Sequence, residues 1–241
     1  PHPGDVTANV RKILSEYLAC GIDPEKAAIY VQSDVKEVLE LYLYLNMNAY
    51  LGELQRVTSF KEKARKQPEN VNAGLYTYPV LMAADILIHR ADKVPVGKDQ
   101  EQNMEMARKF ARRFNTIYGV EFFPEPQSYS FGGDAIKVPG LDGSGKMGKS
   151  EGNAIYLIDD AATIRKKVMK AVTDSGPTQP NREKPEAIAN LFTMLKIVSS
   201  ADTYDYFNEK YNACEIRYGD LKKQLAEDIV NFTSPIRERI L

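Results

Sequence analysis

Apolar residues recur every three or four positions in several parts of the chain, which is the spacing of a helix with one buried face. In the first such part they stand at Val6, Val10, Ile13, Leu14, Tyr17 and Leu18. Asp5 is a suitable N-cap for this segment, and Gly21 is a suitable stop. The pattern therefore predicts a first helix over residues 5–19.

Two short apolar segments, partly β-branched, are typical of buried strands. They are Ala27–Val31 and Lys93–Val96. The second follows a helix expected over about residues 79–91 and leads, through Gly97-Lys98-Asp99-Gln100, into another with apolar positions at Met104, Ala107, Phe110, Ala111 and Phe114. Helices that alternate with strands form parallel sheets covered on both faces. We therefore expect an α/β, doubly wound core.

Strand-like patterns stop at about residue 161. Beyond it the spacing predicts helices over residues 164–172, 185–199 and 221–232, joined by turns such as Ser175-Gly176-Pro177. We therefore predict an α/β domain over residues 1–160, followed by a smaller α-helical domain over residues 161–241.

Composition narrows the class of protein. The 241 residues are 43% hydrophobic, which suffices for a sizeable core. Lys and Arg number 32 and Asp and Glu 33, a net charge of -1, which disfavours a globally basic nucleic-acid wrapper but leaves a local basic patch open. Cys20 and Cys214 are far apart, which disfavours a disulfide framework, a zinc finger or an iron–sulfur site and favours a reducing compartment. No apolar stretch reaches the length of a membrane span, so we expect no membrane association.

The segment from Gly143 to Ser150 combines three glycines with two lysines, a composition suited to binding phosphates. It satisfies the P-loop pattern GxxxxGKS, which requires a helix to start at its Lys-Ser. Here a turn, Glu151-Gly152-Asn153, and a strand-like run, Ala154–Ile158, follow instead. The other readings are a mobile lysine loop that closes on a triphosphate, and a basic surface turn.

Two further segments carry candidate chemistry. Asp85 lies on an otherwise apolar helix, so its carboxylate needs a donor, either from a neighbouring group or from a ligand such as an indole N–H. Gly97 and Gln100 follow the expected strand, where ligands bind in open α/β sheets. Asp99 can cap the next helix, with Gln102 completing a capping box.

These segments together resemble a known family. Lys146-Met147-Gly148-Lys149-Ser150 resembles the KMSKS signature of class I aminoacyl-tRNA synthetases, with Gly148 in place of the central Ser. The Tyr78–Asp85 and Gly97–Gln100 runs closely resemble those of bacterial tryptophanyl-tRNA synthetases, and the similarity spans essentially the whole chain. It implies a Rossmann-like class I parallel sheet, incomplete at its N-terminus, followed by part of the helical domain on the anticodon side of tRNA.

The resemblance also implies roles for individual residues. Asp85 would accept the indole N–H, Met82, Val94 and Val96 would wall the ring, and Tyr78 and Gln100 would hold the ammonium group of tryptophan. The ATP-binding residues would be Gly97, Lys98, Asp99 at the ribose, Val138 at adenine, and Lys146, Met147, Gly148, Lys149 and Ser150. Lys146 and Lys149 would be catalytic, acting on the leaving pyrophosphate.

The activity implied by the resemblance is that of a tryptophan–tRNA ligase. Such an enzyme makes tryptophanyl-adenylate and pyrophosphate from L-tryptophan and ATP, and then transfers tryptophan to tRNA(Trp). We expect Mg²⁺ to arrive with ATP, with no protein-bound metal, and we expect a cytoplasmic homodimer. A P-loop NTPase and a non-catalytic synthetase-like binding module are the alternatives.

One family signature is missing from the chain. Class I synthetases carry an HxGH or HxGN motif, and the two histidines here, His2 and His89, do not supply it. We expect His89 to be an ordinary helix residue. The chain also opens at Pro1 rather than Met, and the resemblance places both of its ends inside the family's usual length. We therefore expect a truncated segment that is inactive when isolated.

Overall fold

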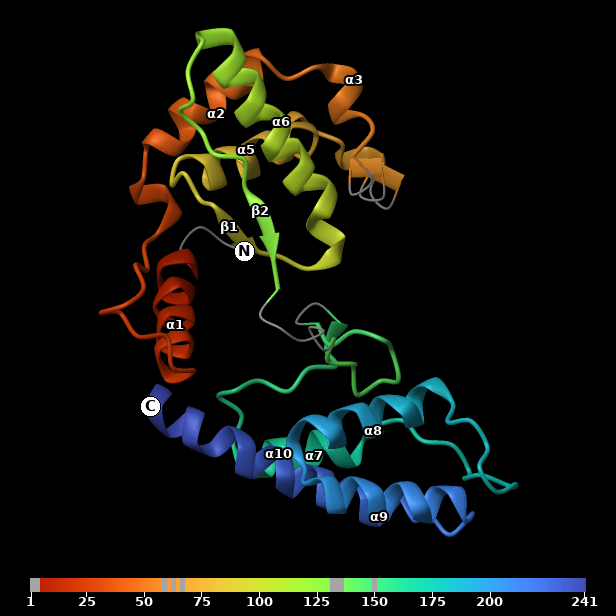
Figure 1. The fold of residues 1–241 in the computed structure, drawn as a ribbon. Coiled ribbons are helices and arrows are strands. Elements are labelled where there is room, and N and C mark those ends of the chain that lie inside the picture. Colours follow the sequence, from red (N-terminus) through yellow and green to blue (C-terminus); the bar gives the residue numbers. More distant parts are fainter. Residues whose placement is uncertain (1–4, 58–59, 62–63, 66–67, 131–136, 149–150) are drawn as a thin grey trace. The chain divides into compact units, whose positions relative to one another are not determined.

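The computed structural model describes residues 5–57, 60–61, 64–65, 68–130, 137–148 and 151–241 (Figure 1). These residues form two compact units, each described by itself below. One is Tyr30–Ala135, and the other combines Pro1–Ile29 with Ile136–Leu241. The expected domain boundary after residue 160 stays a prediction.

The unit Tyr30–Ala135 is built around a parallel pair of strands and three main helices. Strand β1 (Lys93–Pro95) pairs with β2 (Gln127–Tyr129), with Lys93 opposite Gln127. Helix α5 (Ala73–Leu87) packs against α2 (Glu37–Met47) and α6 (Glu101–Tyr118). The shorter elements are η2 (Gln32–Asp34), α3 (Leu51–Leu54), η3 (Pro68–Asn70) and η4 (Lys98–Gln100). The parallel pairing with covering helices agrees with the predicted α/β class.

Helix α5 begins six residues before the expected start at Pro79. Asn72 caps it, because its side-chain oxygen accepts the N–H of Leu75 at 2.9 Å. Proline lacks the N–H that bonds the carbonyl four residues earlier, which makes it unfavourable inside a helix. The buried apolar face of α5, with Val80, Ala83 and Leu87 fully enclosed, compensates for that lost bond.

The strand expected at Ala27–Val31 is wrong for the described structure. Val31 has extended backbone angles, with φ −86° and ψ 124°, but the described part of the chain pairs no strand with this segment. A strand needs a neighbour for its backbone groups, and apolar composition alone does not supply one. The side chain of Tyr30 instead lies 2.5 Å from Nε2 of His89. His89 is not a helix residue either, because α5 ends before it, with Ile88 as its C-cap.

The other unit is helical. Its elements are α1 (Val6–Ala19), α7 (Ala161–Met169), α8 (Glu186–Val198), α9 (Ala201–Asn212) and α10 (Tyr218–Ile240). Helices α7, α8 and α10 enclose the core, whose buried members include Ile164, Val168, Ile188, Leu191, Leu195, Leu221 and Leu225. The first helix agrees closely with the predicted range. At its C-terminus, Arg239 of α10 donates to the carbonyl of Ala19 at 3.0 Å.

The C-terminal helices differ from the expected ranges at their ends. Helix α10 extends well beyond residues 221–232 and passes through Pro235. Helix α9 was not predicted by the apolar pattern. Its N-cap is Ser200, whose hydroxyl accepts the N–H of Thr203 at 3.2 Å. Serine is a preferred N-cap residue, so the sequence contains a local signal for the start of this helix.

Candidate active site

Three of the expected tryptophan-binding residues share one face of α5. Tyr78, Met82 and Asp85 are spaced by four and three positions, so their side chains lie one above the other. All three are half-buried, whereas Val80, Ala83 and Leu87 on the core side are fully buried. The face that carries them is therefore accessible, as the wall of a binding site must be.

Asp85 has a donor from another element. The side-chain nitrogen of Gln32, in η2, lies 2.8 Å and 2.9 Å from the two carboxylate oxygens of Asp85. Of the two donors considered for Asp85, the structure therefore contains the neighbouring group. A ligand can still donate to the same carboxylate, because a carboxylate offers about four lone-pair sites. Gln32 was not identified from the sequence, since the two residues are 53 positions apart.

The end of β1 holds the next group of expected residues. Val94 and Val96 are half-buried and pack against the apolar core of this unit. Gly97 lies so close to Asp99 that a Cβ on it would come 2.6 Å from the Asp99 carboxylate. This segment thus brings backbone and polar side chains together directly after the strand, while Lys98 is exposed.

Asp99 does not cap the following helix. A 3-10 turn, η4, comes first, and α6 starts at Glu101 with Gln100 as its N-cap, so the capping-box prediction is wrong. The Asp99 carboxylate instead accepts the side-chain N–H of Gln100 at 2.9 Å. Gln100 in turn accepts from Asn103 at 2.9 Å. Asn103 is 3% exposed, and its side-chain oxygen has no partner among the described residues.

The lysine segment lies in the helical unit. Its described part forms a loop in which the N–H of Met147 donates to the carbonyl of Val138 at 2.9 Å, and the N–H of Gly140 to that of Ser144 at 2.9 Å. The Met147 side chain packs on the helical core, whereas Lys146 is exposed. Lys149 and Ser150 lie outside the described residues. Val138 and Met147 also line an apolar cavity of about 150 Å³ against α8 and α10.

Asn153 is the hydrogen-bonding centre of this loop. Its side-chain nitrogen donates to Oδ1 of Asp142 (2.9 Å), to Oγ of Ser144 (3.0 Å) and to the carbonyl of Lys146 (3.0 Å). Its side-chain oxygen accepts the N–H of Gly148 at 2.9 Å. Sequence reasoning treated this residue only as part of a turn. The signal that was available is an asparagine three residues after the end of the lysine motif at Ser150.

Asp142 completes this cluster electrostatically. The Ser144 hydroxyl, 2.7 Å from Oδ1 of Asp142, lowers the pKa of this carboxyl most, and the Asn153 amide adds to the effect. The carboxylate is therefore held in its charged form near the base of the lysine loop.

The structural context of a P-loop is missing. Ala154–Ile158 forms no strand, so that expectation is wrong, and the chain instead turns at Tyr156–Asp159. The Asp159 carboxylate pairs with Lys167 of α7 at 2.5 Å. The carboxylate is thus held in a structural ion pair.

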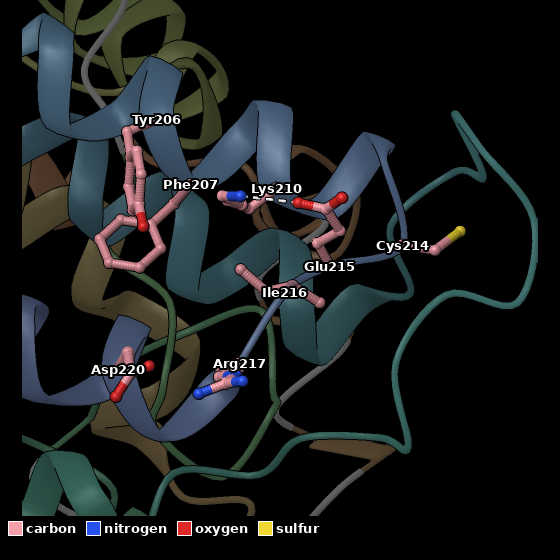
Figure 2. Close-up of a pocket in the computed structure, with 8 residues that line it drawn as sticks. All are labelled: Tyr206, Phe207, Lys210, Cys214, Glu215, Ile216, Arg217 and Asp220. Atoms are coloured by element: carbon pink, nitrogen blue, oxygen red, sulfur yellow. Dashed lines mark hydrogen bonds and ion pairs between the residues drawn. The ribbon is translucent and has the colours of Figure 1, made fainter.

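A separate hollow lies where α9 ends and α10 begins (Figure 2). Its volume is about 560 Å³, and it is lined by Tyr206, Phe207, Lys210, Cys214, Glu215, Ile216, Arg217 and Asp220. Lys210 and Glu215 form an ion pair at 2.6 Å, which raises the pKa of Lys210 and lowers that of Glu215. None of the expected site residues is among its walls.

Two features of the described residues bear on metal binding and on membranes. The described part of the chain contains no group of three or more His, Cys, Asp or Glu side chains placed to hold a metal ion. Within the same residues, every helix is too short or too polar to cross a membrane.

The chain is similar to known proteins over nearly its whole length. The family model "tRNA synthetases class I (W and Y)" matches residues 3–234. The tryptophan–tRNA ligase of Porphyromonas gingivalis is 80% identical over 241 residues, covering 100% of this chain and 74% of that protein. The Helicobacter pylori tryptophan–tRNA ligase is 40% identical over 242 residues, covering 98% of this chain and 72% of that protein.

Solved structures agree with these relatives. The tryptophanyl-tRNA synthetase of Campylobacter jejuni, in a crystal structure with ADP and tryptophan, has a TM-score of 0.81 and 34% identity, covering 100% of this chain and 74% of that one. That of Mycoplasma pneumoniae has a TM-score of 0.75 and 32% identity, covering 100% and 74%. The motifs, the fold and these similarities lead to one conclusion: the chain belongs to the tryptophan–tRNA ligases, within the class I tRNA synthetases for tryptophan and tyrosine.

Proposed function

We propose that this chain carries most of the catalytic machinery that activates L-tryptophan with ATP and transfers it to tRNA(Trp). In the first step the tryptophan carboxylate attacks the α-phosphorus of ATP, a new O–P bond forms, and pyrophosphate leaves with the electrons of the broken P–O bond. The observation that carries the proposal is the 80% identity to a tryptophan–tRNA ligase along the entire chain.

Tryptophan recognition is assigned to the exposed face of α5 and the end of β1. Asp85 accepts the indole N–H, and Gln32 supports its carboxylate from the other side. Met82, Val94 and Val96 wall the ring, and Tyr78 and Gln100 hold the ammonium group. A buried acceptor built for an N–H discriminates strongly against analogues that lack it, because the acceptor is then left unpaired. The half-burial of this face supports the assignment.

ATP binding is assigned to two segments. Gly97, Lys98 and Asp99 contact the nucleotide after β1, with Asp99 at the ribose hydroxyls. Val138 makes a main-chain contact to adenine. Lys146, Met147, Gly148, Lys149 and Ser150 form the loop that binds ATP, and its two lysines contact the phosphates. Lys146 and Lys149 are the catalytic residues, because positive charge placed at the leaving pyrophosphate stabilises the transition state. The exposure of Lys146, with no ion pair to it among the described residues, supports this role.

Mg²⁺ is proposed to arrive with ATP. A cation of this kind binds mainly through substrate phosphates, waters and one or two carboxylates. When bound, the ion neutralises phosphate charge, while the residues above position the reacting atoms.

Assembly as a homodimer is proposed from the surface of the unit Tyr30–Ala135. Apolar side chains gather, exposed, on α2 and α3: Leu39, Leu43, Tyr44, Met47, Tyr50 and Leu51. Exposed apolar side chains that cluster on a protein surface mark protein–protein interfaces. The resemblance to the family favours a second copy of the chain as the partner.

With tRNA(Trp) as the second substrate, we propose that the enzyme acts in the cytoplasm.

Amino-acid-dependent ATP–pyrophosphate exchange tests the proposed function. It is measured with tryptophan, with tyrosine and with no amino acid, on this chain and on the chain at the full length of its relatives. We expect exchange with tryptophan alone, and only at full length. Exchange with tyrosine contradicts the assignment of Asp85. Tryptophan binding without exchange at full length contradicts the ligase and favours a binding module.

A further inference from the structure

The polar centre beneath the lysine loop has a geometry that goes beyond holding a turn. Asn153 is 6% exposed, and both its side-chain nitrogen and its side-chain oxygen form hydrogen bonds within the segment from Asp142 to Gly148. Its NH₂ group has two hydrogens and three acceptors in range, so at least one hydrogen is shared. One buried amide therefore contacts four residues of the loop: Asp142, Ser144, Lys146 and Gly148.

Two of these hydrogen bonds hold the peptides on either side of Met147. Asn153 donates to the carbonyl of Lys146 and accepts the N–H of Gly148. An amide is suited to this task because it donates and accepts from adjacent atoms, whereas a carboxylate only accepts. The backbone from which the Lys146 side chain emerges is thus fixed by a residue outside the lysine motif.

The surroundings give the amide little freedom to move. A Cβ on Gly140 would come 2.2 Å from the Asn153 side-chain nitrogen, so only glycine fits there. On the far side of the loop, Asn190 of α8 donates to the carbonyls of Gly143 and Ser144, both at 3.0 Å. Asn190 therefore fixes the loop to α8 at Gly143 and Ser144. Asn153 fixes the following backbone at Lys146.

From this geometry we propose that Asn153 is a positioning residue for adenylate formation: it sets the backbone at Lys146 so that the ammonium group meets the phosphates of ATP. The inference rests on the proposed function, in which Lys146 acts on the leaving pyrophosphate. Misplacement of a catalytic group by about 1 Å can lower a rate about 100-fold. We therefore expect loss of these hydrogen bonds to lower the rate of adenylate formation and to leave tryptophan binding unchanged.

The test is a double-mutant cycle on the full-length enzyme, measured by tryptophan-dependent ATP–pyrophosphate exchange. We expect Asn153→Ala to lower kcat about 10- to 100-fold, with KM for tryptophan within twofold of the original. In the Lys146→Ala background the same change is expected to have little further effect, because the group that it positions is gone. If the double variant loses kcat by the product of the two single losses, the two residues act independently and the proposal is overturned.

A rearranged pair keeps the test informative if Asn153→Ala folds poorly. Asn153→Asp places two carboxylates together and removes the donor. Adding Asp142→Asn restores a donor and an acceptor between positions 142 and 153, but not the donor to the Lys146 carbonyl. We therefore expect the double variant to regain the melting temperature lost in Asn153→Asp while its kcat stays low, and full recovery of kcat contradicts the inference.

Asn115 provides the matched control. Its amide donates to the carbonyl of Phe123 at 2.9 Å and accepts the N–H groups of Phe122 and Phe123, but it lies in the unit Tyr30–Ala135, outside the lysine loop. Asn115→Ala is expected to lower the melting temperature without any coupling to Lys146→Ala. If Lys146→Ala leaves kcat unchanged, the proposed function of Lys146 fails. If Lys146→Ala slows exchange and Asn153→Ala does not, only the present inference fails.

Discussion

Gln32 donates from one side-chain nitrogen to both carboxylate oxygens of Asp85, at 2.8 Å and 2.9 Å. The contact joins η2 to the exposed face of α5. It fixes the direction in which the carboxylate presents its remaining lone pairs. The residue assigned to recognise tryptophan is thus itself held by a neighbour that lies far away in the sequence.

Gln32→Ala is expected to raise KM for tryptophan about tenfold, because a hydrogen bond to a charged group contributes about 1.5–3 kcal/mol. The measurement is the tryptophan dependence of ATP–pyrophosphate exchange. Gln224→Ala is the matched control, since Gln224 donates to Asp228 at 2.9 Å on the surface of α10. An unchanged KM in Gln32→Ala contradicts a role for this contact in substrate binding.

Asp85→Ala is expected to abolish discrimination for the indole N–H. The original enzyme should prefer tryptophan over its benzothiophene analogue, which lacks the N–H, by about 100-fold or more in kcat/KM. The variant should use both poorly and about equally. Competitive exchange assays with the two amino acids measure the ratio. If the variant retains the preference, another residue reads the N–H.

Lys146→Ala and Lys149→Ala are each expected to lower kcat for adenylate formation about 100- to 1000-fold, the range for removal of one group that stabilises transition-state charge. Tryptophan binding should change little, because neither lysine is assigned to that substrate. Single-turnover adenylate formation and equilibrium tryptophan binding separate the two effects. Lys196→Ala, an exposed lysine of α8, is the control.

The contact between Tyr218 and Asp174 predicts a pH-dependent term in stability. The Tyr218 hydroxyl donates to Asp174 at 2.7 Å, and this hydrogen bond is the main cause that lowers the pKa of the carboxyl. A carboxyl whose pKa is lowered in the folded state stabilises the protein at pH values above the pKa of the unfolded chain, about 3.9. This contribution is lost as pH falls through the pKa of the carboxyl in the folded protein.

Tyr218→Phe is therefore expected to lower the free energy of unfolding at pH 7, by about 1 kcal/mol. The difference from the original protein should begin to shrink below about pH 4, where Asp174 of the unfolded chain becomes protonated, and should continue to shrink as pH falls through the lower pKa of the folded protein. Urea unfolding at several pH values measures it, with Tyr206→Phe, an exposed tyrosine of α9, as control. A difference that is constant with pH contradicts the assigned cause.

Met47→Glu is expected to dissociate the proposed homodimer. Met47, the last residue of α2, is 71% exposed and is one of the apolar side chains of the proposed interface. A buried unpaired charge at an interface is strongly unfavourable. Light scattering after size-exclusion chromatography measures the mass of the full-length protein. Val6→Glu, on an exposed position of α1, is the control. A monomer before any substitution contradicts the proposal outright.

Contiguous sequence determined much of this protein. Helices α1 and α6 follow from their own spacing of apolar residues, because that spacing depends only on the helix repeat. The family could be identified for a similar reason: the lysine motif and the runs around Asp85 and Gln100 are unbroken stretches of chain. Local signals also explain the errors at helix ends, since the Asn72 cap starts α5 before Pro79.

Tertiary structure decided whatever depends on a distant partner. The apolar run Ala27–Val31 has strand composition, but strand formation requires a neighbouring strand that no local pattern contains. Gln32 contacts Asp85 across 53 positions, and the Asn153 amide gathers groups up to 11 positions away around one buried nitrogen. Hydrogen bonds of this kind form only when the rest of the fold brings the two partner residues close together. The family was therefore identifiable from contiguous sequence, whereas the contacts that hold Asp85 and the backbone at Lys146 became visible only in the tertiary structure.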